Sequence, residues 1–99
     1  MEVKELAKVF KALSNENRLE LYFQIVKSSE KSFDAKCECF INEVIDKLNI
    51  GAPTISHHLK ELSNANLIFT EKRGKFLIAT VNQQLLDEIN SILTIKRDE

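Results

Sequence analysis

The sequence predicts a winged helix-turn-helix fold, mainly α-helical with a β-hairpin wing, in the order α-α-α-α-β-β-α. Two observations indicate it. First, two short apolar-periodic segments, 41–48 and 53–62, flank a turn that contains Gly51, as in a helix-turn-helix unit. Second, the apolar period changes to two after residue 66, in two runs around Lys72-Arg73-Gly74. A hairpin directly after such a helix pair is a wing.

The 99 residues predict a single domain, 1–99, at the lower end of the usual size range. Such a chain buries roughly 60–70% of its unfolded surface, so its core is thin and a second copy of the chain is expected to help cover it. No apolar run approaches the roughly 20 residues that span a bilayer, so we expect no membrane partner. The N-terminal segment MEVKELAKVFKAL lacks the apolar stretch of a signal peptide, which predicts a cytoplasmic protein.

The first half of the predicted order consists of two helices and a loop. Apolar residues at spacings of three and four predict the first helix, and they are Val3, Leu6, Ala7, Phe10 and Leu13. Ser14 is predicted to cap the second helix. The apolar stripe of that helix consists of Leu19, Tyr22, Phe23 and Val26. The polar, aperiodic stretch 27–36 then predicts a loop.

The helix pair follows that loop. The third helix has the apolar residues Ile41, Val44, Ile45 and Leu48, and Asn49 and Gly51 end it. Pro53 suits the first turn of the fourth helix, whose apolar stripe is Ile55, His58, Leu59 and Leu62. Because His58 lies on this stripe, we expect a packed, hydrogen-bonded histidine rather than a ligand or a contact residue.

The wing and a last helix complete the chain. The runs 67–71 and 75–81 predict two strands with glycine at the tip of their hairpin. Asn82 is predicted to cap a final helix. Its apolar residues are Leu85, Leu86, Ile89, Ile92 and Leu93.

The residues that point away from the stripe of the fourth helix suit contacts with DNA. The second helix of such a unit lies in the major groove, where short polar side chains approach base edges closely. The candidates there are Thr54, Ser56, His57 and Lys60. The hairpin adds Lys72, Arg73 and Lys75, which would meet phosphates or the minor groove. The alternative is that these residues lie on an ordinary solvent-exposed helix and turn and contact no DNA.

Charge and motifs restrict the class of function. The net charge of −1 gives no sign of nucleic-acid binding, but residues 52–76 carry four basic residues against two acidic ones. No nucleophile elbow, phosphate loop or paired-histidine metal motif is present, so we do not expect an enzyme. The other class of function is a winged-helix module for protein contacts, or a small thiol carrier of soft metal, without DNA binding.

Four stretches of the chain resemble the ArsR/SmtB family of metal-responsive winged-helix repressors. They are FKALSNENRLELYFQI (10–25), CEC (37–39), NIGAPTISHHLKELSNANLI (49–68) and EKRGKFLIATV (71–81). The resemblance implies a homodimeric repressor that binds a palindromic operator in double-stranded DNA and leaves it when a metal or metalloid binds. It also implies that the first and last helices form the dimer interface.

The same resemblance assigns Cys37 and Cys39 the role of metal ligands. The arsenic, cadmium and lead branches of the family carry a C-x-C at the start of the first helix of the DNA-binding pair. The arsenic branch adds a third cysteine three residues later, where this chain has Asn42. The zinc branch uses histidines on the last helix, and residues 82–99 contain none. We therefore expect an inducer of the arsenite, cadmium or lead class and no other cofactor.

The spacing of the two thiols restricts how they could act together. On an α-helix, side chains at i and i+2 point in different directions, whereas in an extended segment they point the same way. Joint ligation by Cys37 and Cys39 therefore requires residues 37–39 to be non-helical. If the third helix begins near Cys37 in the free form, ligation would pull out its first turn and re-aim the fourth helix, and a helix start would lower the thiol pKa.

Two further interpretations of the cysteines stay open. The pair could sense oxidants instead, because a local disulfide would force the same extended geometry. Alternatively, both cysteines pack as small apolar residues and sense nothing.

Overall fold

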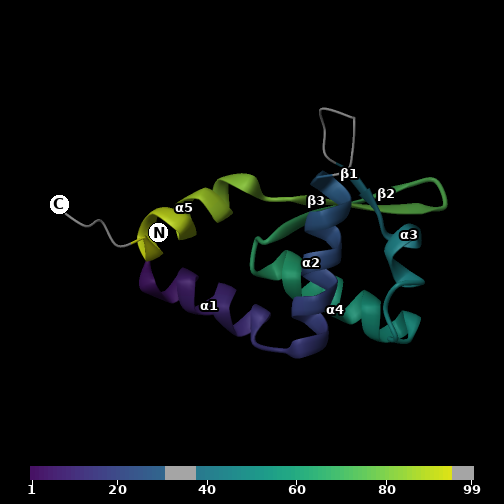
Figure 1. Ribbon diagram of the computed structural model, residues 1–99, viewed down its shortest axis with the longest axis horizontal. Coiled ribbons are helices and arrows are strands. Elements are labelled where there is room, and N and C mark those ends of the chain that lie inside the picture. Colours follow the sequence, from purple (N-terminus) through teal and green to yellow (C-terminus); the bar gives the residue numbers. More distant parts are fainter. Residues whose placement is uncertain (31–37, 95–99) are drawn as a thin grey trace.

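The computed structural model describes residues 1–30 and 38–94, and within them the predicted elements form in the predicted order with one addition. Figure 1 shows the helices arranged around a small sheet. The helices are α1 (Val3–Leu13), α2 (Glu16–Glu30), α3 (Ile41–Ile45), α4 (Ala52–Asn64) and α5 (Gln83–Leu93). The strands are β1 (Glu38–Phe40), β2 (Ile68–Arg73) and β3 (Phe76–Val81), of which β1 is the addition.

Two sequence predictions fall on undescribed residues. Cys37, one of the two predicted metal ligands, lies outside the described residues. So does most of the loop predicted over 27–36. The described part of that stretch corrects the prediction, because α2 continues to Glu30.

The sheet is antiparallel, with β3 in the centre and the order β1-β3-β2. Cys39 of β1 stands opposite Ala79, and Arg73 at the end of β2 stands opposite Phe76. The hairpin turns at Gly74, whose φ of 63° lies in the left-handed region that glycine enters without strain. The predicted glycine tip is therefore confirmed.

The core lies between α2, α3, α4 and one face of the sheet. Leu21 and Ile25 of α2 and Leu62 of α4 are fully buried in it, and Cys39 of β1 belongs to the same cluster. The stripes of α3 and α4 therefore face inward, as their periodicity predicts. This packing fixes which side of α4 remains for solvent.

The helix caps differ from the prediction at one end of α2. Ser14 does not cap this helix: its hydroxyl donates to the carbonyl of Lys11 at 2.7 Å. Instead, the side-chain oxygen of Asn15 accepts from the Arg18 amide at 3.0 Å, because α2 starts one residue later than Ser14 requires. The cap of α5 is confirmed, since the Asn82 side chain accepts from the Leu85 amide at 3.3 Å.

The third helix is shorter than its apolar pattern. It ends at Ile45, and the amides of Lys47 and Leu48 donate to Val44 and Ile45, three residues back, at 3.1 Å each. Tighter hydrogen bonds of this type are common where a helix ends. Leu48 nevertheless stays buried, so the apolar period holds while the α-helical geometry does not.

The two terminal helices lie at one end of an elongated molecule of 51 × 29 × 21 Å. In Figure 1 the start of α1 and the end of α5 both lie at the left end of the long axis, and the wing tip lies at the right end. None of the residues of α5, all of which the structure describes, is fully buried. Large apolar side chains here remain exposed, with Val3 at 84%, Leu93 at 57% and Ile92 at 47%. One chain therefore does not cover these two helices.

Across the described residues, no helix is long and apolar enough to cross a membrane.

Candidate nucleic-acid interface and cysteine strand

Helix α4 separates its side chains into two sets. Pro53 occupies its first turn, after Gly51 in extended conformation. Ile55, His58, Leu59 and Leu62 are buried against the core. All four candidate contact residues are exposed: Thr54, Ser56, His57 and Lys60. The buried stripe thus orients a polar edge toward solvent, and a helix N-terminus carries the partial positive charge that favours phosphate nearby.

His58 is packed as predicted but lacks the predicted hydrogen bond. Only 5% of its surface is exposed, and neither ring nitrogen has a partner among the described residues. Burial lowers the pKa of His58 from its ordinary value, and the nearby charges of Arg18 and His57 lower it further. The imidazole is therefore held neutral inside the core.

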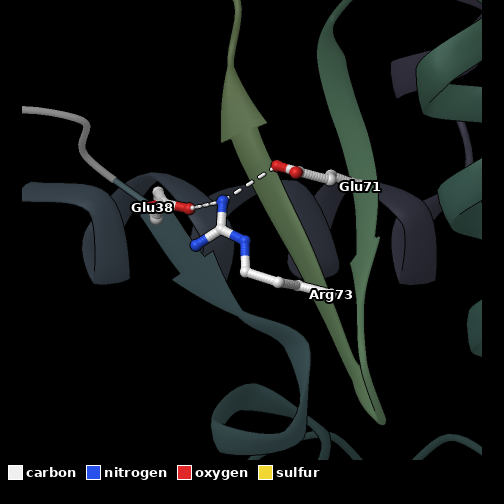
Figure 2. Close-up of polar contacts among 3 residues, drawn as sticks. All are labelled: Glu38, Glu71 and Arg73. Carbon is white, nitrogen blue, oxygen red and sulfur yellow. Dashed lines mark hydrogen bonds and ion pairs between the residues drawn. The ribbon is translucent and has the colours of Figure 1, made fainter.

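The three basic residues of the wing differ in their surroundings. Lys72 and Lys75 are exposed, and the Lys75 ammonium lies 5.6 Å from the centre of the Phe76 ring. Arg73 instead holds two carboxylates: its Nη2 lies 2.7 Å from Glu38 of β1 and 2.9 Å from Glu71 of β2. Figure 2 shows the guanidinium between these two side chains. Hydrogen bonds to Glu38 first and Glu71 second raise the pKa of Arg73.

Cys39 lies in the centre of β1, in extended backbone and fully buried against the core. Residues 38 and 39, the described part of the segment that joint ligation requires to be non-helical, are therefore extended. The third helix begins at Ile41, where its apolar pattern begins, so the condition of a helix start near Cys37 is not met. The expectation of a lowered pKa is wrong for Cys39. Burial, reinforced by Glu43, raises the pKa of the thiol, while a hydrogen bond to Ser28 and the charge of Lys47 oppose the rise.

A cavity of about 290 Å³ lies between α2, β1 and α3. Ser28, Glu43 and Lys47, which act on the Cys39 thiol, all line it. The carboxylate-bearing Glu38 lines it as well. The remaining lining residues are Gln24, Lys27, Phe40 and Val44. Cys39 itself does not line the cavity and packs in the apolar core, but a hollow with charged side chains thus lies next to its strand.

The described residues do not complete a metal site. Among residues 1–30 and 38–94, no group of three or more His, Cys, Asp or Glu side chains is placed to hold an ion. Asn42, at the place of the third cysteine, is exposed on α3.

Sequence reasoning missed β1 and its contact with the wing. A strand of three residues gives almost no periodic signal, and the pairing of Glu38 with Arg73 joins positions 35 residues apart. The available signal was the Glu-Cys-Phe alternation just before the third helix, which fits one buried and two less buried positions of a strand.

Comparisons with known proteins agree with this geometry. The sequence model of the "Bacterial regulatory protein, arsR family" matches residues 35–69, the part of the chain from the cysteine segment to the start of β2. The "Arsenical resistance operon repressor" of Staphylococcus xylosus is 33% identical over 95 residues, covering 96% of this chain and 83% of the relative.

A second relative and a solved structure extend the comparison. The "Cadmium resistance transcriptional regulatory protein CadC homolog" of Staphylococcus aureus is 27% identical over 85 residues, covering 86% of this chain and 64% of the relative. The solved structure of an "ArsR-like Transcriptional Regulator from Rhodococcus sp. RHA1" superposes with a TM-score of 0.69. It covers 91% of this chain and 76% of that one at 23% identity, which bears on the fold alone.

Proposed function

The chain belongs to the arsR family of bacterial regulatory proteins, DNA-binding transcriptional repressors rather than enzymes, and we propose that it acts as a homodimer released from a palindromic operator by a thiophilic metal or metalloid. The observation that carries the DNA-binding part is the exposed polar edge of α4, whose opposite stripe is buried.

The proposed DNA contacts divide between base edges and phosphates. Thr54, Ser56 and His57 lie near the start of α4, where a recognition helix meets base edges in the major groove. Lys60 follows one turn later, and Lys72 and Lys75 extend the positive surface to the wing. Arg73 belongs to the same basic hairpin, but its two carboxylate partners restrict its reach toward phosphate.

The proposed dimer is formed by α1 and α5. Both helices are strongly amphipathic in sequence, yet α5 has partly buried residues at best and α1 buries only Val9 and Ala12. The exposed Val3 begins α1 and the exposed Ile92 and Leu93 end α5, and these two helix ends both lie at the end of the molecule away from the wing tip. A symmetric partner would cover these side chains and give the single domain 1–99 the apolar contact area that its thin core lacks.

The proposed inducer site is the cysteine segment. Thiolates favour soft or borderline ions such as arsenite, cadmium and lead, and the relatives named for arsenical and cadmium resistance support that class. The donor set fits such an ion only after a change of structure, because the Cys39 thiol faces the core. We propose that an ion reaches the Cys39 thiol only when residues 38–40 leave the sheet, so that β1 would act as the switch.

One observation favours a second candidate, a repressor of the same family that does not sense through these thiols. Cys39 is fully buried and its thiol pKa is raised, so the reactive thiolate is scarce in the closed conformation. The same observation disfavours fast thiol oxidation. A carrier of soft metal without DNA binding is the remaining alternative, and the family assignment speaks against it.

The test is a release assay on DNA. The wild-type protein is bound to a labelled palindrome selected from a random pool, and arsenite, cadmium, lead, zinc and peroxide are titrated side by side. We expect release by a thiophilic ion, and unchanged DNA binding without release in the variant Cys37→Ser with Cys39→Ala, where alanine suits the buried position. Release that persists in this variant would place the sensor elsewhere, and a wild type that binds no DNA would refute the proposed function as a whole.

A further inference from the structure

Glu38 is a carboxylate shared between the cysteine strand and the wing. It stands between the two cysteines in sequence, and its side chain is only 10% exposed. Its partner is Arg73, at 2.7 Å, on the hairpin strand β2. Because β3 lies between β1 and β2, this ion pair spans the whole width of the sheet.

The pair supplements a weak backbone connection. Strand β1 has three residues, which pair with Ile78, Ala79 and Thr80 of β3 along one edge of the sheet. Short edge strands of this kind open locally at small free-energy cost. Cys39 is the middle residue of this strand and its side chain is buried in the core, so opening of β1 would expose the thiol. A side-chain tie across the sheet therefore bears directly on access to the thiol.

We propose that Glu38 and Arg73 form a latch that keeps β1 on the sheet, keeps Cys39 covered and holds the wing in its DNA-binding position. In this role Arg73 positions the wing through Glu38, whereas Lys72 and Lys75 are the wing residues that meet phosphates. The effect on the DNA-binding position of the wing rests on the function proposed above, whereas the effect on β1 and on the cover of Cys39 does not.

The cavity beside Cys39 gives the latch a means of release. Glu38 lines this cavity, together with Glu43 and the thiol's neighbour Ser28. Lys27 and Lys47 line it too, so the cavity offers the Glu38 carboxylate ammonium partners other than Arg73. Since coupling is reciprocal, whatever loosens β1 also loosens the wing, and whatever fixes the wing protects the thiol.

The first experiment measures access to the Cys39 thiol and needs no DNA. In a Cys37→Ser background, alkylation of Cys39 is timed for Arg73→Gln, Glu38→Gln, the double variant and the control Lys72→Gln. Neither Lys72 nor Lys75 forms an ion pair with any described residue. When reclosing is fast, the rate follows the open population. We expect each latch variant to react about fivefold faster, the order of a partly exposed ion pair, and the double variant no faster than the singles.

The results of this experiment decide the first part of the proposal. Arg73→Lys, which keeps the charge, serves if the glutamine variant does not fold, and it should accelerate alkylation less. Equal rates in wild type and latch variants, or an equal acceleration in Lys72→Gln, would overturn the latch.

The second experiment measures DNA affinity against salt concentration. A latch predicts that Glu38→Gln and Arg73→Gln both lower affinity severalfold with an unchanged salt slope, while Lys72→Gln reduces the slope by about 0.9 for each subunit. If Arg73 merely contacts phosphate, Glu38→Gln should strengthen binding, because it removes a competing negative charge. That outcome would overturn the role of the latch in the wing. If the wild type binds no DNA, the proposed function fails, and the alkylation rates still decide the latch.

Discussion

At the scale of single residues, two adjacent histidines of α4 have opposite surroundings. His57 is exposed on the proposed contact edge, and His58 is buried with both ring nitrogens unpartnered among described residues. A buried polar group without a hydrogen-bond partner lowers stability. His58 is nevertheless buried, as is the next residue of the helix, Leu59. His57 is thus available for contacts with DNA, whereas His58 packs in the core.

The buried histidine predicts how stability depends on pH. The folded-state pKa of His58 lies below its ordinary value of 6.5, so below that pH the unfolded chain binds a proton that the folded chain does not. Its contribution to stability is therefore complete above about pH 6.5 and declines as the pH falls. Urea unfolding at pH 7.5 and 5.5 should show a smaller pH effect in His58→Leu than in wild type. The matched change His57→Leu should leave most of the effect, because burial, the first cause of the lowered His58 pKa, remains. Equal pH effects in all three proteins would contradict this assignment.

The buried thiol predicts a stability cost that is separate from sensing. Cys39 is fully buried with Ser28 beside its thiol. Cys39→Ser places a more strongly solvated hydroxyl there and should lower the free energy of unfolding by about 1–3 kcal/mol, while Cys39→Ala keeps the apolar character and should cost less. Denaturant midpoints of the two variants at equal m-value provide the check. A serine variant as stable as the alanine variant would show that the thiol site is wetter than its burial implies.

At the scale of elements, the helices and the hairpin are predictable and β1 is not. The period of 3.6 in the stripes of α3 and α4 correctly predicts which faces of these helices are buried. The period of two around Gly74 correctly predicts the hairpin but not its buried face, because the neighbours Ile78 and Ala79 are both buried. The strand β1 depends on pairing with β3, some forty residues away, and three residues carry no period of their own. The polar edge of α4 can likewise be predicted from its helical period. The ion pair between Arg73 and Glu38 cannot, because it joins distant positions through the unpredicted strand β1.

The cap of α5 yields a prediction at this scale. The Asn82 side chain accepts from the Leu85 amide and also donates to the Asn66 carbonyl at 2.8 Å, which joins the helix start to the turn before β2. Asn82→Ala should lower the free energy of unfolding by about 1 kcal/mol or more. Asn82→Asp keeps the cap but loses the donor, so its free energy of unfolding should lie between those of the wild type and Asn82→Ala. Urea unfolding with Gln84→Ala, an exposed site on the same helix, is the control. An alanine variant as stable as this control would refute the cap.

At the scale of the whole molecule, the elongated shape separates two surfaces. The apolar end of α1 and α5 lies at one end of the long axis, and the wing tip lies at the other (Figure 1). If the apolar end joins two copies, each wing is carried away from the contact, as a protein that grips two half-sites requires. Family membership is shown by the comparisons, whereas the dimer is our proposal.

The dimer predicts an effect of charge at the apolar end. Ile92→Lys with Leu93→Lys should convert a dimer to a monomer in sedimentation, since each buried leucine or isoleucine side chain contributes about 1.5–3 kcal/mol and a symmetric contact counts it twice. Phe69→Lys is the matched control, because Phe69 on the hairpin is 55% exposed, close to the 57% of Leu93. If the Ile92→Lys with Leu93→Lys variant sediments as the same assembly as the Phe69→Lys control, α5 does not form the dimer contact.

The most direct test of the account concerns the preference of α4 for its DNA. The wild-type protein and the variant Thr54→Ala with His57→Ala are titrated against the selected palindrome and a scrambled duplex at one salt concentration. Loss of base contacts, each worth roughly 1–3 kcal/mol of discrimination, should reduce the variant's preference by tenfold or more while its binding to the scrambled duplex stays nearly constant. A variant that keeps the full preference of the wild type would show that this edge of α4 does not read the operator.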